Sequence, residues 1–146
     1  MTEVIGAKVA LFCNGRLLTY LRDDTPGLPW PAHWDLPGGG LEQSENAEQG
    51  LFREVFEEFG LRLTPAHLLW KGLFPTTHSP GKQAAFFAGT LTQAEIAAIR
   101  FGDEGQRWQM MPVADWLSHP RAVPALQDRT RAALASGALG RHPAAN

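Results

Sequence analysis

Residues 34–61 read WDLPGGGLEQSENAEQGLFREVFEEFGL, a glycine run followed by an acidic segment with a regular apolar pattern. Apolar side chains recur every four residues in its second half, at Ala47, Leu51, Val55 and Phe59, with Phe52 and Phe56 beside them. This spacing predicts an amphipathic helix whose apolar stripe faces a core. Ser44 is expected to cap the N-terminus of this helix, with Glu45 in the first turn. Gly60 lies where a left-handed residue commonly ends a helix.

Three glutamates, Glu54, Glu57 and Glu58, share one face of this helix because they are spaced i, i+3 and i+4. Arg53 can pair with Glu57 one turn on, but one arginine cannot neutralise three carboxylates. Clustered hard oxygen ligands suit Mg²⁺ or Mn²⁺. The alternative is a solvated acidic surface, which is the usual meaning of such a run when it stands alone.

Glycines mark two places near the acidic face. The run Pro37 to Gly40 can adopt backbone angles closed to other residues and so present amides or carbonyls to an ion or a phosphate. Gly50 lies inside the predicted helix, where glycine costs about 1 kcal/mol relative to alanine. It indicates either a close approach by the glycine-rich loop or tolerated sequence drift.

The spacing G-x5-E-x7-R-E-V-x-E-E-x-G-L from Gly39 to Leu61, with WDLPGGGLE leading into it, resembles the Nudix box. That box is the signature of enzymes that cut diphosphate linkages in nucleoside diphosphate derivatives. The resemblance implies an α/β fold, the Nudix α/β/α sandwich with a mixed β-sheet between helices. It also implies a metal-dependent hydrolase that uses Mg²⁺ or Mn²⁺.

Roles for the box residues follow from the resemblance alone. It implies that Glu57 and Glu58 are metal ligands, that Glu54 is a third ligand or the general base, and that Arg53 orients the carboxylates. The Gly39 carbonyl is a further implied ligand. The remaining box positions have an implied role in holding the loop and helix, namely Gly38, Gly40, Glu45 and Gly60.

A second acidic candidate lies outside the box. The segment Gly102-Asp103-Glu104-Gly105-Gln106 resembles the Glu-Gly-Gln loop of MutT-type members, in which the glutamate is an additional metal ligand or base. Glu104 matches that position. The alternative is a surface turn, since Asp, Glu and Gly are ordinary turn residues.

Substrate recognition is expected to involve aromatic side chains, because bases stack on them. Trp30 and Phe74, beside proline-containing loops, are the candidates, with His78 as a phosphate or base contact; most aromatics in a domain of this size belong to the core. The expected substrate is a small-molecule nucleotide, a nucleoside triphosphate or an oxidised deoxynucleotide. ADP-ribose, nucleotide sugars and dinucleoside polyphosphates remain open. Two alternatives belong to other functional classes: a non-catalytic nucleotide sensor and an isoprenoid diphosphate isomerase.

Composition sets further bounds. The 146 residues form one predicted domain over 1–136, with 137–146 as a flexible C-terminal tail. A net charge of −2 gives no electrostatic case for a nucleic-acid polymer as partner. The single cysteine, Cys13, allows no internal disulfide and fits the cytoplasm. No apolar run indicates a membrane segment, and a homodimer is left open.

Outside the box, periodicity and turn residues place the other elements. Strands are expected at 5–12, 16–21, 66–74, 83–91 and 107–112, the first two joined by a tight turn at Asn14-Gly15. Loops are expected at 22–33 and 74–82. A short helix should start at a Thr92–Glu95 capping box and end near Arg100, and a last helix should cover 124–135.

Overall fold

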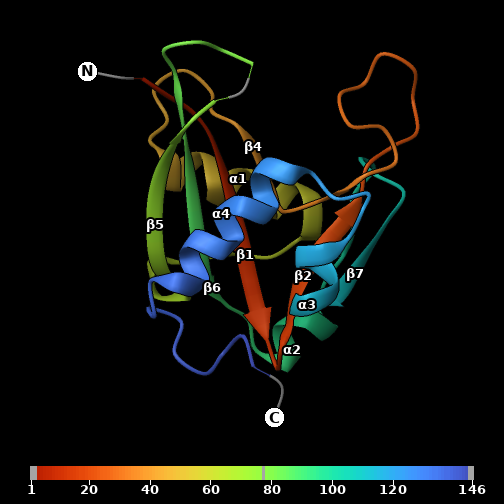
Figure 1. Cartoon of the computed structure of the whole chain (residues 1–146), viewed down its shortest axis with the longest axis vertical. Helices are drawn as coiled ribbons and strands as arrows, with labels where there is room; N and C mark the ends of the chain where they lie inside the picture. Colours follow the sequence, from red (N-terminus) through yellow and green to blue (C-terminus); the bar gives the residue numbers. More distant parts are fainter. Residues whose placement is uncertain (1–2, 77, 145–146) are drawn as a thin grey trace.

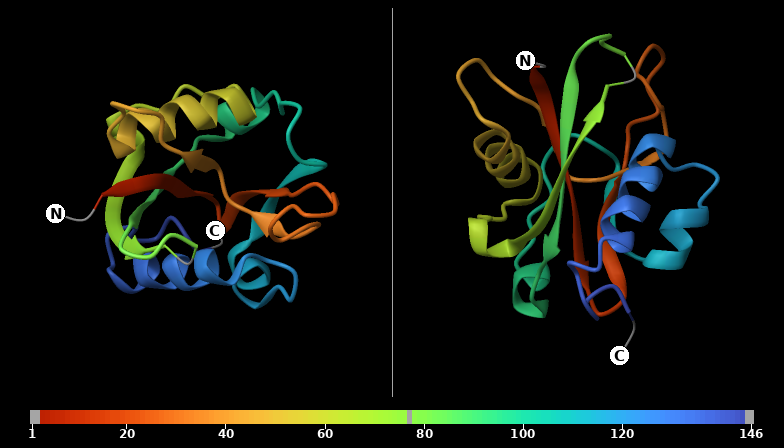
Figure 2. Two further views of the ribbon diagram at one scale, coloured as in Figure 1. Left: turned by 90° about the horizontal axis from the view of Figure 1, so that it is seen from above. Right: turned by 60° about the vertical axis from the view of Figure 1, so that its left-hand side comes forward.

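The computed structural model of the chain describes residues 3–76 and 78–144. A mixed seven-stranded sheet forms its middle layer, with α1 on one face and α3 and α4 on the other (Figures 1 and 2). This is the α/β/α sandwich expected from the sequence.

The strand order across the sheet is β3-β2-β1-β6-β5, with β4 pairing to β1 and β7 pairing to β2. The strands are β1 (Val4–Cys13), β2 (Arg16–Leu21), β3 (Trp34–Asp35), β4 (Gly38–Gly40), β5 (Leu68–Pro75), β6 (Gln83–Thr90) and β7 (Arg107–Pro112). Only the β1–β6 pair is parallel among the described strands. The turn after β1 has positive φ at both Asn14 (49°) and Gly15 (76°), the conformation that an Asn-Gly hairpin favours.

Helix α1 (Ala47–Phe59) carries the acidic face and begins later than expected. Its N-cap is Asn46, which forms a reciprocal capping box with Gln49; Ser44 lies upstream with φ 72°, and Glu45 precedes the first turn. Asn and Ser cap almost equally well, so composition alone could not choose between them. The C-terminal end is as expected, with Gly60 left-handed at φ 67°.

The other helices are η1 (Pro65–His67), α2 (Gln93–Ala97), α3 (Val113–Ser118) and α4 (Pro124–Ala135). Helix α2 has the expected capping box but ends before Arg100. Sequence periodicity missed η1 and α3, which are one to two turns long. None of the helices in the described part of the chain is long and apolar enough to cross a membrane.

Two apolar clusters, one on each face of the sheet, hold the layers together. Leu51, Val55 and Phe59 of α1 pack against one face, and Leu126 and Ala133 of α4 belong to the cluster on the other. The stripe of α1 is narrower than expected, because Phe56 is exposed beneath the guanidinium of Arg62. The 137–146 segment, expected to be a flexible tail, places the buried side chain of Leu139 in the second cluster; residues 145–146 lie outside the described residues.

An opening in the sheet positions the site. β1 pairs with β2 only next to their hairpin, at Phe12–Leu17 and Cys13–Arg16, and the two strands then diverge (Figure 1). Along its first half β1 pairs instead with β4, the glycine run. The expected loop at Pro37 to Gly40 is therefore partly strand. The opening lies between β1 and β2, with the glycine run along one side.

Candidate active site beside the glycine run

Arg53 lies at the centre of the acidic face of α1. Its Nε and Nη2 donate to the two carboxylate oxygens of Glu45 at 2.8 and 3.0 Å, and its Nη1 donates to Glu54 at 3.0 Å. Nη2 also donates to the Gly40 carbonyl at 3.1 Å, and Glu57 is 3.4 Å from Nη1. The arginine therefore ties the helix to the loop before it and orients Glu54, while Glu57 keeps 56% of its side chain exposed.

Glu58 and Glu54 flank the backbone of the glycine run. The Gly38 amide donates to Glu58 Oε1 at 2.9 Å. A Cβ on Gly39 would lie 2.8 Å from Glu54 Oε2, so a side chain there would require the Glu54 carboxylate to move away from the strand. Gly38 is more tightly constrained, because its φ is 124° and a Cβ there would overlap the backbone carbonyl of Ala7.

Among the described residues, no cation forms an ion pair with the partly buried carboxylate of Glu58. Burial raises the pKa of Glu58 to about 8, against the positive charge of Lys8 and the Gly38 hydrogen bond, and the nearby charge of Glu54 adds to the rise. A cation between Glu54 and Glu58 would relieve this cost.

The donor set here fits a hard divalent cation. Glu54, Glu58 and the Gly39 backbone offer oxygen atoms and no sulfur or imidazole. The described residues contain no cluster of three or more His, Cys, Asp or Glu side chains that would enclose an ion. Mg²⁺ commonly retains waters and takes substrate phosphate oxygens as ligands, so an open site of this kind suits it.

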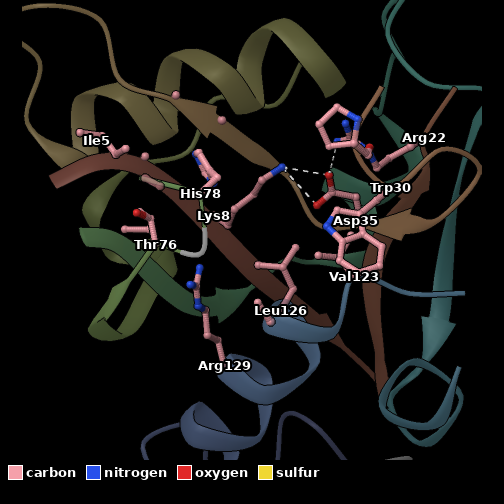
Figure 3. Close-up of a pocket in the computed structure, with 17 residues that line it drawn as sticks. Ile5, Lys8, Arg22, Trp30, Asp35, Thr76, His78, Val123, Leu126 and Arg129 are labelled. Atoms are coloured by element: carbon pink, nitrogen blue, oxygen red, sulfur yellow. Dashed lines mark hydrogen bonds and ion pairs between the residues drawn. The ribbon is translucent and has the colours of Figure 1, made fainter. Parts of the chain in front are cut away.

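A cavity of about 410 Å³ lies on the other side of the glycine run (Figure 3). Gly39 and Gly40 form part of its wall, so the cavity and the glutamates share this stretch of backbone. Its volume lies within the range of ligand pockets in proteins.

A buried carboxylate organises one end of the cavity. Asp35 in β3, 2% exposed, accepts hydrogen bonds from Lys8 Nζ (3.2 Å), Arg22 Nη1 (2.8 Å) and the Tyr20 hydroxyl (3.0 Å). Burial alone would raise the pKa of Asp35, but Lys8 and Arg22 hold it below its ordinary value. Lys8 also donates to the Leu36 carbonyl at 3.0 Å and so anchors the approach to the glycine run.

A family model described as the NUDIX domain matches residues 6–132. The chain belongs to the NUDIX family. Among proteins, it is 32% identical over 112 residues to an RNA pyrophosphohydrolase of Tolumonas auensis, a match that covers 62% of this chain and 64% of that protein. The chain thus spans less than two thirds of that relative's length.

Solved structures share the fold. A MutT protein from Methanosarcina mazei Go1 superposes with a TM-score of 0.73 at 20% identity, covering 93% of this chain and 96% of that one. A bifunctional NMN adenylyltransferase/ADP ribose pyrophosphatase from Francisella tularensis, complexed with AMP and a manganese ion, gives 0.69 at 20% identity, covering 92% of this chain and 42% of that one.

The three residues expected to contact the substrate do not all lie at the cavity. Trp30 and His78 line the cavity, whereas Phe74 does not line it and lies beneath Arg129. Trp30 has a positive φ of 52°, which is costly for a bulky residue, and the residue is 46% exposed.

The loop expected to supply Glu104 reaches the C-terminal end of α1. The Gly102 amide donates to the Glu58 carbonyl at 2.8 Å, and the Gly105 amide donates to Asp23 at 3.2 Å. Glu104 itself is exposed, and no described contact joins it to Glu54, Glu57 or Glu58. Its role as a metal ligand or base stays a prediction.

Four charged residues of the cavity were missed by sequence reasoning: Lys8, Arg22, Asp35 and Arg129. One signal was available, because Lys8 interrupts an otherwise apolar strand. Lys8 and Asp35 are 27 positions apart in sequence, so their pairing depends on the fold.

Proposed function

We propose that this protein hydrolyses a diphosphate linkage in a nucleoside diphosphate derivative, using Mg²⁺ or Mn²⁺. The observation that carries the proposal is the arrangement of Glu54 and Glu58 on one side of the Gly38–Gly39 backbone and a ligand-sized cavity on the other. A substrate in the cavity would present its phosphates along the glycine run, next to the carboxylates.

The chemistry requires charge neutralisation and an activated water. A divalent ion supplies Lewis acidity at the phosphate and lowers the pKa of a bound water. Glu54, Glu58 and the Gly39 carbonyl would hold the ion, with Glu57 as a further ligand. Arg53 positions Glu54 through its 3.0 Å hydrogen bond. The carboxylate that takes the proton from water would be one of the box glutamates or Glu104.

We expect the ligand of the cavity to be a nucleotide rather than a polyphosphate without a base. Trp30 offers an exposed aromatic surface on which a base can stack. The candidates are nucleoside triphosphates, an oxidised deoxynucleotide included, and ADP-ribose, nucleotide sugars and dinucleoside polyphosphates. The similarity to the RNA pyrophosphohydrolase of Tolumonas auensis adds RNA to this panel.

The test is phosphate and pyrophosphate release from this panel with Mg²⁺ or Mn²⁺, with and without a coupled phosphatase, and with the products identified. Turnover of one class with a defined fragment released would support the hydrolase and show which phosphorus is attacked. Tight nucleotide binding without turnover on any member would favour the non-catalytic sensor instead.

We expect Glu58→Gln to lower turnover by about two orders of magnitude or more, because it removes a metal-binding charge without changing the side-chain volume. Glu57→Gln should act in the same direction. Glu48→Gln is the matched control, since Glu48 lies on the same helix but pairs with Lys71 on the surface. Near wild-type kcat in both the Glu57 and Glu58 variants would refute the proposed metal site.

A further inference from the structure

The cavity extends on both sides of Lys8, and the two sides differ in chemistry. Figure 3 shows Arg22, Trp30 and Asp35 on one side, and Thr76, His78 and Arg129 on the other. The positive charge of Arg129, on the second side, has no part in the hydrolysis proposed above.

Arg129 is held in place by groups that do not neutralise it. It projects from α4, its guanidinium carbon lies 5.3 Å from the centre of the Phe74 ring, and its Nη2 donates to the Pro75 carbonyl at 3.1 Å. Phe74 is in turn packed edge-on against Phe86. The aromatic ring and the carbonyl fix the orientation of the guanidinium, so little conformational entropy remains to be lost when it binds a ligand.

Charges along the cavity are unbalanced. Among the described residues that line it, Asp35 is the one carboxylate, and Lys8 and Arg22 both pair with it. No ion pair to a carboxylate is formed by Arg129 in the described structure, although the residue is partly buried. Partial burial also lowers the pKa of Arg129, which reflects the cost of holding this charge away from water.

An oxyanion would neutralise this charge, and a guanidinium edge matches a phosphate with paired hydrogen bonds. We propose that Arg129 is a specificity-determining residue that binds a phosphate group of the nucleotide other than its 5′-α-phosphate. The phosphate is either the terminal one of a longer polyphosphate chain or one attached to the ribose. The proposal rests on the proposed function only in taking the ligand to be a nucleotide.

Equilibrium binding separates the two sources without requiring turnover. AMP, ADP and adenosine 3′,5′-bisphosphate differ by one phosphate at the chain end or on the ribose, and calorimetry would measure their Kd with wild-type protein and with Arg129→Met and Arg129→Lys variants. Another base replaces adenine if the activity panel selects one. We expect one of the two ligands that carry an additional phosphate, ADP or adenosine 3′,5′-bisphosphate, to bind wild type at least about tenfold more tightly than AMP.

Arg129→Met should remove that preference while changing AMP affinity less than about twofold, and Arg129→Lys should restore part of it. Arg131→Met is the matched control, because Arg131 lies on the same helix, pairs with Asp128 and does not line the cavity. Urea unfolding of each variant checks that loss of the Pro75 hydrogen bond has not altered the fold.

Two outcomes overturn the proposal: equal affinity of wild type for all three ligands, or the same loss of affinity for AMP and its phosphorylated forms in Arg129→Met. The second outcome would assign Arg129 to the nucleoside or to the cavity wall. If the protein hydrolyses nothing but its preference for the additional phosphate is lost in Arg129→Met, this inference holds and the proposed function fails. If the protein hydrolyses a nucleotide but Arg129→Met keeps the wild-type preference, the proposed function holds and this inference fails.

Discussion

The carboxylate of Asp35 links the strands that form one end of the cavity. Its carboxylate is buried and accepts from Lys8 on β1, Arg22 at the end of β2 and Tyr20 on β2. These contacts span the opening between the two strands. A buried ion pair is costly to form, but removing one partner is costlier still, because the other charges stay behind.

We expect Asp35→Asn to lower the free energy of unfolding at pH 7 by about 3 kcal/mol, because Lys8 and Arg22 lose their counter-charge. Since the pKa of Asp35 is held below its ordinary value in the folded protein, its stabilising effect is present above pH 3.8 and is lost as the pH falls further. Wild type should therefore lose stability more steeply than the variant in acid. Urea unfolding between pH 3 and 7 measures both effects.

Asp128→Asn is the control for this change, because Asp128 pairs with Arg131 at the surface with 79% of its side chain exposed. Surface pairs of this kind contribute little. If Asp35→Asn were no more destabilising than Asp128→Asn, the buried network would not be holding β1, β2 and β3 together.

The positions of several candidate residues were predictable from sequence, whereas their roles in binding metal and substrate stay predictions. Glu54 and Glu58 lie beside the glycine run as the helical spacing and the box imply, and Trp30 and His78 line the cavity. Phe74, expected to contact the substrate, does not line the cavity and packs beneath Arg129, because an aromatic residue on a strand faces either way depending on the register. Its contact with substrate stays a prediction.

At the scale of elements, α1 is linked to the loop that precedes it through a close contact at Gly50. A Cβ at this position would lie 2.2 Å from Leu41 Cδ2, and Leu41 follows directly on the glycine run. Of the two explanations for a glycine in this helix, the geometry supports close approach. Alanine would favour the helix, but the end of the Leu41 side chain would have to move to make room for it.

A double-mutant cycle tests this link. In a Leu41→Ala background, Gly50→Ala should raise the free energy of unfolding by about 1 kcal/mol, the difference in helix propensity. In wild type the same substitution should give no such gain, because Leu41 must move. Urea unfolding of the four proteins gives the coupling energy; a gain of equal size in both backgrounds would show that the contact has no energetic consequence.

Helices and strands were predicted correctly where a long sequence pattern marks them, and were missed where a short strand forms only by pairing with another strand. Helix α4 has the expected bounds, 124–135, because a Pro start and a long run of helix-forming residues mark it. β3 and β4 are two and three residues long and exist only through partners on β2 and β1. No local pattern of that length distinguishes a strand from a loop.

At the scale of the whole molecule, the acidic face of α1 and the basic cavity lie on opposite sides of one strand of glycines. Glu54 and Glu58 both lie beside the glycine run, and burial, with a smaller effect from the nearby charge of Glu54, raises the pKa of Glu58. A divalent cation bound there would stabilise the folded chain as a whole, because the unfolded chain does not bring these carboxylates to the Gly39 backbone.

We therefore expect Mg²⁺ at about 100 times its Kd to add about 2.7 kcal/mol to the free energy of unfolding and to raise Tm by roughly 5–10 °C. Differential scanning calorimetry in EDTA and in Mg²⁺ measures the shift without substrate or turnover. Glu58→Gln should lose most of it, whereas Glu48→Gln should keep it, since both remove one charge from α1 but only Glu58 contacts the glycine run. If Mg²⁺ raised the Tm of the Glu58 variant as much as that of wild type, the ion would bind elsewhere. The glycine run would then not separate a metal site from the substrate cavity.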